Sequence, residues 1–470
     1  MDNFEQHEHE VKKLQAQVRS RQRLLSLGQA TLHSNTTRSA DYKKNSNKVS
    51  IEALDRVLHI DAARKVALCE PRVSMQKLAQ ECLKMGFVPS VVSEFKGITV
   101  GGAIIGCGGE SSSLHYGLFH DTCPKLELIL GDGELVTASQ HENSDLFDAL
   151  GGSYGSLGML VRAEVSLRKA SDWVNITPYR FSSGKAAIQK ISELMQQERP
   201  PEYLEGIIFS DTDACVLVGE LADLPSGELL RDGLFSQWYY RFAQEQMAPF
   251  SMSLYDYLFR YDRGAFWMGA YVAHFPILKK LFMEGIWKLQ TPKLFTSDER
   301  SHFAKLSCPN VLMRALSYPF MTSQSLFSLL HSCEEWIHKR LLVQDFTLPA
   351  STCSLFLDDL RDICPVYPLW LCPLKAKKNS NIFAPHSLNG EDSINIGIYG
   401  VPKNSLPLPE ILASLEQKLF ERGGRKWLYA NSCYTAEQFW NVYSEPLYRN
   451  LRKKYNAEDA WISIEEKVLV

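Results

Sequence analysis

The sequence predicts an α+β fold with two domains and a C-terminal segment. At 470 residues the protein exceeds the roughly 250 to 300 residues at which single hydrophobic cores stop growing. Short β-like runs and two helical runs occupy the chain up to about residue 170, and longer aromatic-rich helices alternate with strands from there to about residue 425. We therefore expect domains over 1–170 and 171–425, both α+β, and a segment over 426–470 that packs back on them.

Composition excludes several classes of protein. With 45% hydrophobic and 22% charged residues, the chain is predicted to be globular rather than disordered or fibrous. A net charge of -3 is not typical of a protein that binds the phosphate backbone of nucleic acids. The 11 cysteines show no short paired spacing of the kind that holds zinc, so we expect reduced thiols and no metal site.

The N-terminus begins with a polar, acidic run and has no apolar core of a signal peptide, which predicts a cytoplasmic location. The most apolar later stretch, Ala265 to Trp287, carries too many polar groups for a simple spanning helix. Together with Phe235 to Phe250 it could form an aromatic and cationic surface resting on a membrane. A buried helix pair is an equally good interpretation.

The first domain is predicted element by element from periodicity and turn residues. Helical spacing covers Glu8 to Arg23 and Val73 to Met85, and Gly86 stands where a helix C-cap is preferred. Gly131-Asp-Gly133 is a tight-turn sequence and predicts a hairpin. The predicted strands are 24–27, 57–61, 65–70, 125–130, 134–137 and 158–167, with a polar loop over 28–48. In the last segment, Trp427 to Ala430 is strand-like and helices follow around Phe439 and Leu451.

Five glycines fall in one short window, Thr99 to Ser113. Glycine lets backbone N–H groups approach an oxyanion without a Cβ in the way, so a phosphate is the natural ligand of such a loop. A purely structural glycine-rich turn is the alternative. The run is neither a Walker A loop nor a dinucleotide fingerprint that opens a helix after a first strand.

The neighbouring motifs carry a family resemblance. Thr99–Ser113, Tyr116-Gly117, Gly131–Gly133, Asn143–Phe147 and Gly155–Gly158 resemble the PCMH-type FAD-binding domain of the vanillyl-alcohol oxidase family. Within that family, Glu110–Ser113 with Tyr116–Phe119 is similar to the delta-24 sterol reductases, or Diminuto-like proteins. Further similar motifs are Arg260–Trp267, Val343–Asp345, Tyr367–Pro373, Ile396–Gly400, Leu428–Ala430, Phe439-Trp440, Leu447-Tyr448 and Leu451-Arg452. The resemblance covers Gln17 to Val468 but not the extra membrane-anchoring segment of the eukaryotic reductases, so it does not by itself support fixed membrane insertion.

The resemblance implies non-covalent FAD and a C-terminal segment that lies near the flavin. A first pyrophosphate loop would follow Gly28, with Gln29, Thr31, His33 and Ser34 offering amides and hydroxyls, and His33 as a polar contact rather than a covalent attachment. The residues expected to bind FAD are Gly28, His33, Ser34, Thr99, Val100, Gly101, Gly102, Ala103, Ile104, Ile105, Gly106, Cys107, Gly108, Gly109, Glu110, Ser111, Gly155 and Gly158.

The implied reaction passes hydride from NADPH through FAD to an alkene in the side chain of a sterol or other lipid, and a protein acid completes the reduction. Candidate acids are Glu110, Asp345 and Tyr116, followed by Tyr367 and Tyr429. For Glu110, a carboxylate that caps backbone amides or binds ribose hydroxyls is an equal alternative. Other functions left open are an FAD-linked oxidase or dehydrogenase of an alcohol or lipid-linked sugar, and a non-enzymatic FAD-binding scaffold.

Overall fold

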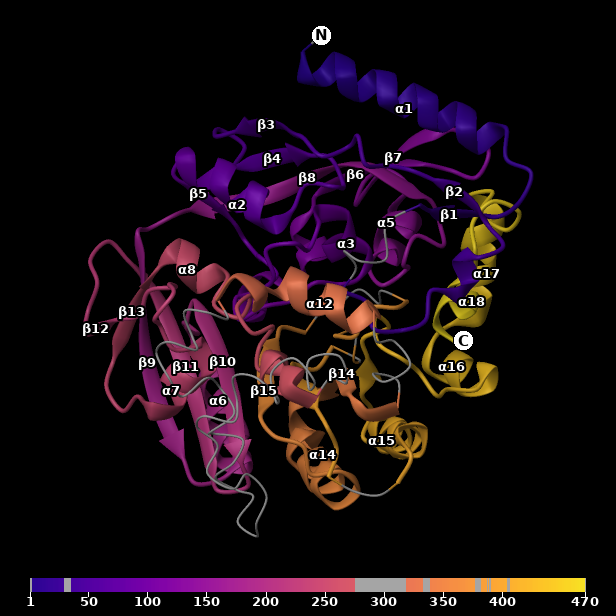
Figure 1. Ribbon diagram of the computed structural model, residues 1–470. Coiled ribbons are helices and arrows are strands. Elements are labelled where there is room, and N and C mark those ends of the chain that lie inside the picture. Colours follow the sequence, from indigo (N-terminus) through magenta and orange to yellow (C-terminus); the bar gives the residue numbers. More distant parts are fainter. Residues whose placement is uncertain are drawn as a thin grey trace.

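A computed structural model shows two large β-sheets, one above the other in Figure 1, with helices around them. Among the described residues, Leu25–Leu27 and Asn47–Val49 form a further, two-stranded sheet. The structure describes residues 2–28, 35–274, 318–332, 339–376, 382–386, 388, 390–403 and 406–469. The mixture of helices and sheets confirms the predicted α+β class. The predicted domain boundaries at residues 170 and 425 remain predictions.

The smaller sheet has the strand order β3-β4-β8-β6-β7, and β5 also pairs with β8. Its strands are β3 (Val57–Asp61), β4 (Val66–Cys69), β5 (Phe87–Pro89), β6 (Lys125–Ile129), β7 (Leu135–Ser139) and β8 (Met159–Lys169). The predicted hairpins are confirmed, and Gly133, at the turn between β6 and β7, has a φ of +83° that side-chain-bearing residues rarely adopt. The long strand β8 is antiparallel to three neighbours and holds this sheet together.

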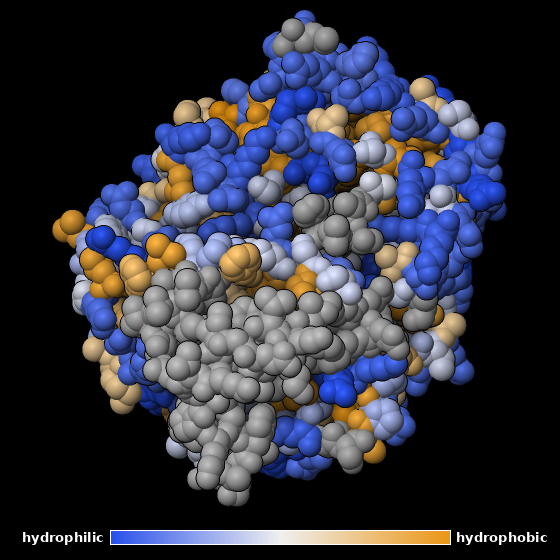
Figure 2. Space-filling view, in the orientation of Figure 1, coloured by the Kyte–Doolittle hydropathy of each residue, from blue (hydrophilic) through white to orange (hydrophobic). Residues whose placement is uncertain are grey.

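Helix α1 (Asn3–Arg19) lies along the top of the molecule in Figure 1. It begins five residues before the predicted Glu8, because Asp2 and Glu5 form a capping box at its N-terminus. Its apolar side packs on the small sheet and the C-terminal segment through Val11, Leu14 and Val18. Its outward side is mostly hydrophilic (Figure 2), as its charged sequence predicts.

Short elements connect the strands of the small sheet. They are β1 (Leu25–Leu27), a 3-10 helix η2 (Asp41–Lys43), β2 (Asn47–Val49), α2 (Met75–Lys84), α3 (Val100–Ile105), α4 (Ser113–Tyr116), a 3-10 helix η3 (Phe119–Thr122) and α5 (Ser144–Leu150). The prediction of a continuous loop at the glycine run is wrong in part, because six of its residues form α3. The apolar spacing of Val100, Ala103 and Ile104 buries one side of that turn of helix and outweighs the low helix propensity of its glycines.

The larger sheet has nine strands in the order β12-β13-β9-β11-β10-β15-β16-β14-β17. They are β9 (Trp173–Phe181), β10 (Tyr203–Ser210), β11 (Asp213–Ala222), β12 (Glu228–Leu229), β13 (Phe250–Ser253), β14 (Leu342–Pro349), β15 (Leu369–Leu374), β16 (Ser393–Gly400) and β17 (Arg425–Lys426). Every neighbouring pair is antiparallel except β12 with β13.

The two sides of the large sheet have different partners. Helices α6 (Gly184–Met195), α14 (Ala350–Ile363) and α15 (Leu408–Glu421) cover one side and share a core with it. Because side chains alternate along a strand, Leu342 and Phe346 of β14 enter that core, while Val343 and Asp345 face the opposite way, toward the small sheet. This second side therefore carries the residues available to a site between the sheets.

Within the stretches for which a membrane surface and a buried helix pair were equal interpretations, most described aromatics are buried, while Phe235 and Met247 are exposed. Contact with a membrane stays a prediction. Phe266 and Trp267 are buried, and so are most aromatics of the segment 235–250, because they pack against one another beneath the large sheet. Residues 275–287 lie outside the described residues. The elements here are α7 (Tyr239–Glu245), α8 (Leu254–Leu258), the 3-10 helices η4 (Met268–His274) and η7 (Tyr318–Phe320), and α12 (Ser323–Ser332). Among the helices that the described residues form, none combines the length and apolar character needed to cross a membrane.

The C-terminal segment returns to the small sheet through α16 (Ala436–Val442), α17 (Glu445–Lys454) and α18 (Ile464–Val468). Arg452 of α17 donates to the Ser156 carbonyl oxygen over 2.6 Å. The strand expected over Trp427–Ala430 is wrong, because β17 ends at Lys426 and the backbone then turns. Beyond Lys426 the Trp427 indole donates to Thr347 and the Tyr429 hydroxyl donates to Asp345. These are side-chain hydrogen bonds to β14, in place of the backbone pairing that a continued β-strand would form.

Candidate active site

Two adjoining cavities lie beside α3, between the small sheet and the uncovered side of the large one. The first is mostly apolar and reaches β14, β15 and β16, and the second extends toward η2 and the C-terminal helices. Both are lined by Thr36, Thr99, Gly102 and Tyr154, so they form one elongated site. The cavities enclose about 200 and 250 Å³, so neither alone exceeds the roughly 300 to 1000 Å³ typical of a small-molecule pocket. Because they share four wall residues, the site suits an elongated, two-part ligand that extends through both.

The glycine run contributes to both cavities, but only part of it faces them. Thr99, Gly102, Ala103, Gly106, Gly108 and Gly109 line the first cavity, and Thr99, Gly101, Gly102, Ile105, Gly155 and Gly158 line the second. Val100, Ile104, Cys107 and Ser111 are instead buried behind the walls. Gly28 does not line either cavity and donates its N–H to the Val49 carbonyl oxygen. Gln29, Thr31, His33 and Ser34 lie outside the described residues.

The glycines of the run are needed for two different reasons. A Cβ on Gly108 would overlap the Ser93 hydroxyl, and one on Gly109 would approach Leu118 and Trp427 at 2.8 Å, so these positions are fixed by packing. A Cβ on Gly102 would meet only Thr99 Oγ1, at 3.1 Å, and otherwise faces the space shared by the cavities. Gly102 is therefore the position where close approach of a ligand to the backbone best explains the glycine.

Basic side chains surround the second cavity. Arg38, Lys43, Arg72 and Lys467 line it, and among the described residues no carboxylate does. Burial, together with the neighbouring charge of Arg38, lowers the pKa of Lys467 well below its usual range. A buried cation without a counter-charge is costly, so an anion bound here would offset a cost that the protein otherwise carries.

Sequence reasoning missed these cations. Arg38 lies inside a stretch that reads as a plain polar loop, and Lys467 is 429 positions away in the sequence. The Arg38 guanidinium donates to the carbonyl oxygens of Leu428 and Lys467, which brings the two basic residues to one wall. No local pattern signals such a pairing.

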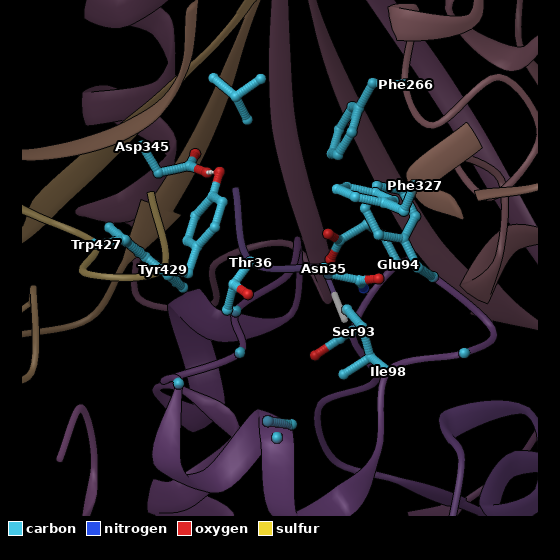
Figure 3. A pocket seen from close by; sticks show the side chains of 18 of the residues that line it. Asn35, Thr36, Ser93, Glu94, Ile98, Phe266, Phe327, Asp345, Trp427 and Tyr429 are labelled. Carbon is cyan, nitrogen blue, oxygen red and sulfur yellow. Dashed lines mark hydrogen bonds between the residues drawn. The ribbon is translucent and has the colours of Figure 1, made fainter. Parts of the chain in front are cut away.

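The polar wall of the first cavity is built around Asp345 of β14. Its carboxylate accepts hydrogen bonds from Asn395 Nδ2 at 2.6 Å, from the Tyr399 hydroxyl at 2.9 Å and from the Tyr429 hydroxyl at 2.6 Å. Burial raises the pKa of Asp345, and the three hydrogen bonds oppose that rise. Figure 3 shows the Tyr429 hydroxyl turned onto this carboxylate at one side of the cavity. Asp345 was predicted from sequence, and the structure brings it to the site.

A second carboxyl group, on Glu94, faces the same cavity from the opposite side (Figure 3). Glu94 lies in the loop between β5 and α3 and was missed by sequence reasoning, because a single acidic residue in a short loop resembles a solvated one. Burial raises the pKa of Glu94 to about 8. The nearby Ser93 hydroxyl and Asn35 side-chain amide, which also line this cavity, find no hydrogen-bond partner within the described residues.

Glu110 and Tyr116, the other two predicted acids, do not line either cavity. Glu110 is buried in an ion pair with Arg260 at 2.8 Å, and it accepts hydrogen bonds from the backbone N–H and the hydroxyl of Ser111. Of the two alternatives for Glu110, the structure therefore favours the carboxylate that binds a backbone amide. The half-buried Tyr116 donates to Glu202 over 3.3 Å, away from the cavities.

The remaining candidates differ in position. The Tyr367 hydroxyl donates to Asp211 over 2.6 Å, and Tyr367 lines neither cavity. Trp370 lines the first cavity as an apolar wall, while its indole N–H donates to Glu205 over 2.8 Å. The orphaned polar groups of the first cavity and the unpaired charge of the second together fit a molecule with a polar-edged ring at one end and phosphates toward the other.

Comparison with known proteins agrees with this geometry. Residues 6–139 match the FAD binding domain family. Delta(24)-sterol reductases of Mus musculus and Homo sapiens are each 27% identical over 478 residues, which span 98% of this protein and 86% of theirs. The Delta(24)-sterol reductase of Arabidopsis thaliana is 26% identical over 466 residues, 92% of this protein and 78% of its own length. Cytokinin dehydrogenase 1 of the same plant is 31% identical over 137 residues, 29% of this protein and 24% of its own length.

The site and these matches define the protein as an FAD-dependent oxidoreductase with a PCMH-type FAD-binding domain. More particularly, it resembles the Delta(24)-sterol reductases along nearly its whole length, which confirms the resemblance that the sequence motifs predict.

Proposed function

We propose that this protein uses NADPH and FAD to reduce a C=C bond in the side chain of a sterol or other lipid. The observation on which the proposal rests is the elongated site itself. It has a basic half and an apolar half, and among the described residues that line it, carboxyl groups occur only in the apolar half. Such a division suits a cofactor whose phosphates and reactive ring occupy different halves, beside an apolar substrate. The full-length similarity to the sterol reductases supports the same reaction class.

The residues present fit non-covalently bound FAD. Gly101, Gly102, Gly155 and Gly158 would allow close approach of the cofactor in the second cavity, and the cations along its wall would balance the pyrophosphate. In the first cavity, the orphaned Ser93 hydroxyl has the chemistry to bond a polar ring edge. Bound flavin supplies the two-electron chemistry, and the protein supplies orientation, exclusion of water and a proton.

The protein's own residues have separable tasks in this proposal. Phe266, Met268, Phe327 and Trp370 form apolar walls that admit a hydrocarbon and exclude water. Asp345 is a positioning residue, because its carboxylate already accepts three hydrogen bonds and fixes the hydroxyls of Tyr399 and Tyr429. Glu110 has a supporting role, because it joins the glycine run to Arg260 and does not reach the cavity.

Anaerobic flavin spectroscopy tests the function in two stages. NADPH is mixed with the FAD-loaded protein, and bleaching of the oxidised flavin spectrum is expected. Desmosterol is then added, and return of the oxidised spectrum with formation of the saturated product by mass spectrometry is expected. A flavin that NADPH leaves oxidised, but that an alcohol substrate reduces, would contradict the proposal and favour the oxidase or dehydrogenase alternative.

The proposed lipid substrate also implies contact with a membrane surface from the cytoplasmic side. The side chains of Leu224 and Met247 are each 77% exposed and that of Phe235 is 62% exposed. Exposed apolar side chains of this kind can insert at a lipid interface. Sedimentation with phosphatidylcholine vesicles tests this: the protein should pellet with vesicles, and a Phe235→Ser, Met247→Ser variant should pellet less. Wild-type protein that stays in the supernatant would refute the contact.

A further inference from the structure

The carboxyl group of Glu94 has a fixed place in the first cavity. Glu94 belongs to the loop between β5 and α3, and the next residue, Phe95, packs its ring against Phe266 at 5.7 Å and Phe327 at 5.6 Å. One residue further, the Lys96 N–H donates to the Asp262 carboxylate over 2.9 Å. These contacts hold the loop, so the direction of the Glu94 side chain follows from the packing of its neighbours. Figure 3 shows its carboxyl group turned toward the middle of the cavity.

The surroundings of that carboxyl group are mostly apolar. Ile98, Phe266, Phe327 and Trp370 line the cavity near it, and no hydrogen bond or ion pair joins its side chain to another of the described residues. Asp345, by contrast, accepts three hydrogen bonds, and Glu110 is paired with Arg260. Of these three acids, Glu94 alone lines the cavity and accepts no hydrogen bond from another described residue.

We propose that Glu94 is the catalytic residue that donates the proton to the substrate alkene. The inference rests on the proposed function, and it names the acid that this function requires. Bound FAD, once reduced, would supply a hydride equivalent to one alkene carbon, and the Glu94 carboxylic acid would give its proton to the other. The C=C bond would thereby become CH–CH with the two electrons drawn from the cofactor, and the Glu94 carboxylate would recover a proton from water.

The charge state of Glu94 is compatible with this role. Burial raises the pKa of Glu94 to about 8, so the group is mostly neutral at physiological pH and can donate a proton. The groups that act on it are Asp345 of β14, Tyr399 of β16, Tyr429 beyond β17, Glu110, and Arg260 after α8. The two carboxylates disfavour a further negative charge, and Arg260 favours it, so burial remains the dominant cause.

The test separates the two halves of the reaction in the FAD-loaded protein. For Glu94→Gln, flavin reduction by NADPH should stay within about twofold of wild type, while reoxidation by desmosterol should slow by about 10² to 10⁴-fold, as loss of a general acid predicts. Glu94→Asp should recover part of the reoxidation rate. The matched control is Glu81→Gln, an exposed carboxylate on α2 that pairs with Lys84, and both rates should be unchanged.

Two further readouts distinguish proton donation from a structural role. The wild-type reoxidation rate should fall as pH rises through about 8, and this dependence should shift in Glu94→Asp and vanish in Glu94→Gln. Without substrate, infrared difference spectra between wild type and Glu94→Gln should contain the C=O stretch of a protonated carboxyl group that disappears over the same pH range. In D₂O the wild-type product should carry deuterium on the carbon that receives the proton, whether or not exchange at the flavin also places deuterium on the other carbon.

The outcomes are distinct. If desmosterol fails to reoxidise the wild-type flavin, the proposed function itself fails. If wild type reacts and Glu94→Gln reoxidises equally fast, only the role of Glu94 is overturned. If Glu94→Gln loses flavin reduction and reoxidation equally, Glu94 positions the flavin instead. Should Glu94→Gln not take up FAD, a flat wild-type pH profile would still overturn the proposal.

Discussion

Gly102 is the glycine whose replacement tests the cofactor site most directly. It lies within α3 and lines both cavities, and a Cβ there would meet only Thr99 Oγ1 at 3.1 Å on the protein side. Gly102→Ala should therefore fold normally. Because alanine is favoured over glycine inside a helix by about 0.8 to 1 kcal/mol, the FAD-free variant should be as stable as wild type or slightly more so.

Binding of FAD should respond in the opposite direction. An added methyl group in a close-packed contact costs about 1 to 3 kcal/mol, and each 1.4 kcal/mol is about tenfold in a dissociation constant, so FAD should bind about 5- to 150-fold more weakly. Quenching of flavin fluorescence on titration of the FAD-free protein measures this. Gly233→Ala is the control, because its Cβ would have only Ser236 nearby, at 3.6 Å, and the position lies outside both cavities. Unchanged affinity in Gly102→Ala would refute the placement of the cofactor against α3.

Three other substitutions test separate parts of the site. Lys467→Met removes a buried cation whose pKa is lowered by burial. FAD should therefore bind about 10- to 100-fold more weakly, as expected for the loss of a charged hydrogen bond, while the FAD-free protein should keep its thermal midpoint. Equal FAD affinity would argue against a pyrophosphate at this position. Arg260→Met leaves the carboxylates of Glu110 and Glu205 buried without their shared cation, and should cost about 3 to 5 kcal/mol at neutral pH in urea unfolding followed by tryptophan fluorescence. Burial raises the pKa of Glu205, but Arg260 and further hydrogen bonds outweigh it and hold the pKa below its usual value, so this stabilisation is lost as pH falls. The difference between wild type and variant should therefore shrink in acid, and a difference that grows would contradict the argument. Asp345→Asn weakens the hydrogen-bond acceptor of the Tyr399 and Tyr429 hydroxyls. Alkene-dependent flavin reoxidation should therefore slow by about 10- to 100-fold, with FAD content retained. An unchanged rate would refute the positioning role of Asp345.

Local sequence signals predicted those parts of the fold whose causes are local. The turn at Gly131–Gly133 and the alternation along β8 needed no distant partner, and both strands and turn are present. Trp427–Ala430 failed because its side chains are held by separate long-range contacts, with the Trp427 indole on Thr347 and the Tyr429 hydroxyl on Asp345. An aromatic composition alone cannot distinguish a strand in a β-ladder from a turn anchored in this way.

The same limit applies to the site. The glycine run and Asp345 were found because each stands within a recognisable motif. Arg38, Lys467 and Glu94 were not, because a cation in a polar loop, a cation near the C-terminus and a lone glutamate each have an ordinary surface interpretation. Only the fold shows that all three are directed at one elongated space.

The carboxyl groups near the glycine run show how environment can assign different chemistry to the same functional group. Glu110 is paired with the Arg260 guanidinium and a backbone N–H, which hold it in place but leave it no access to the cavity. Glu94 is 16 positions earlier in the sequence and makes no ion pair with Arg260, and burial is the largest of the causes that act on its pKa and favours the neutral acid. Two acids in such different environments can take different roles in one site, one structural and one as proton donor. Exchanging the roles would require moving Arg260, so Glu110 should not replace Glu94 in the Glu94→Gln variant.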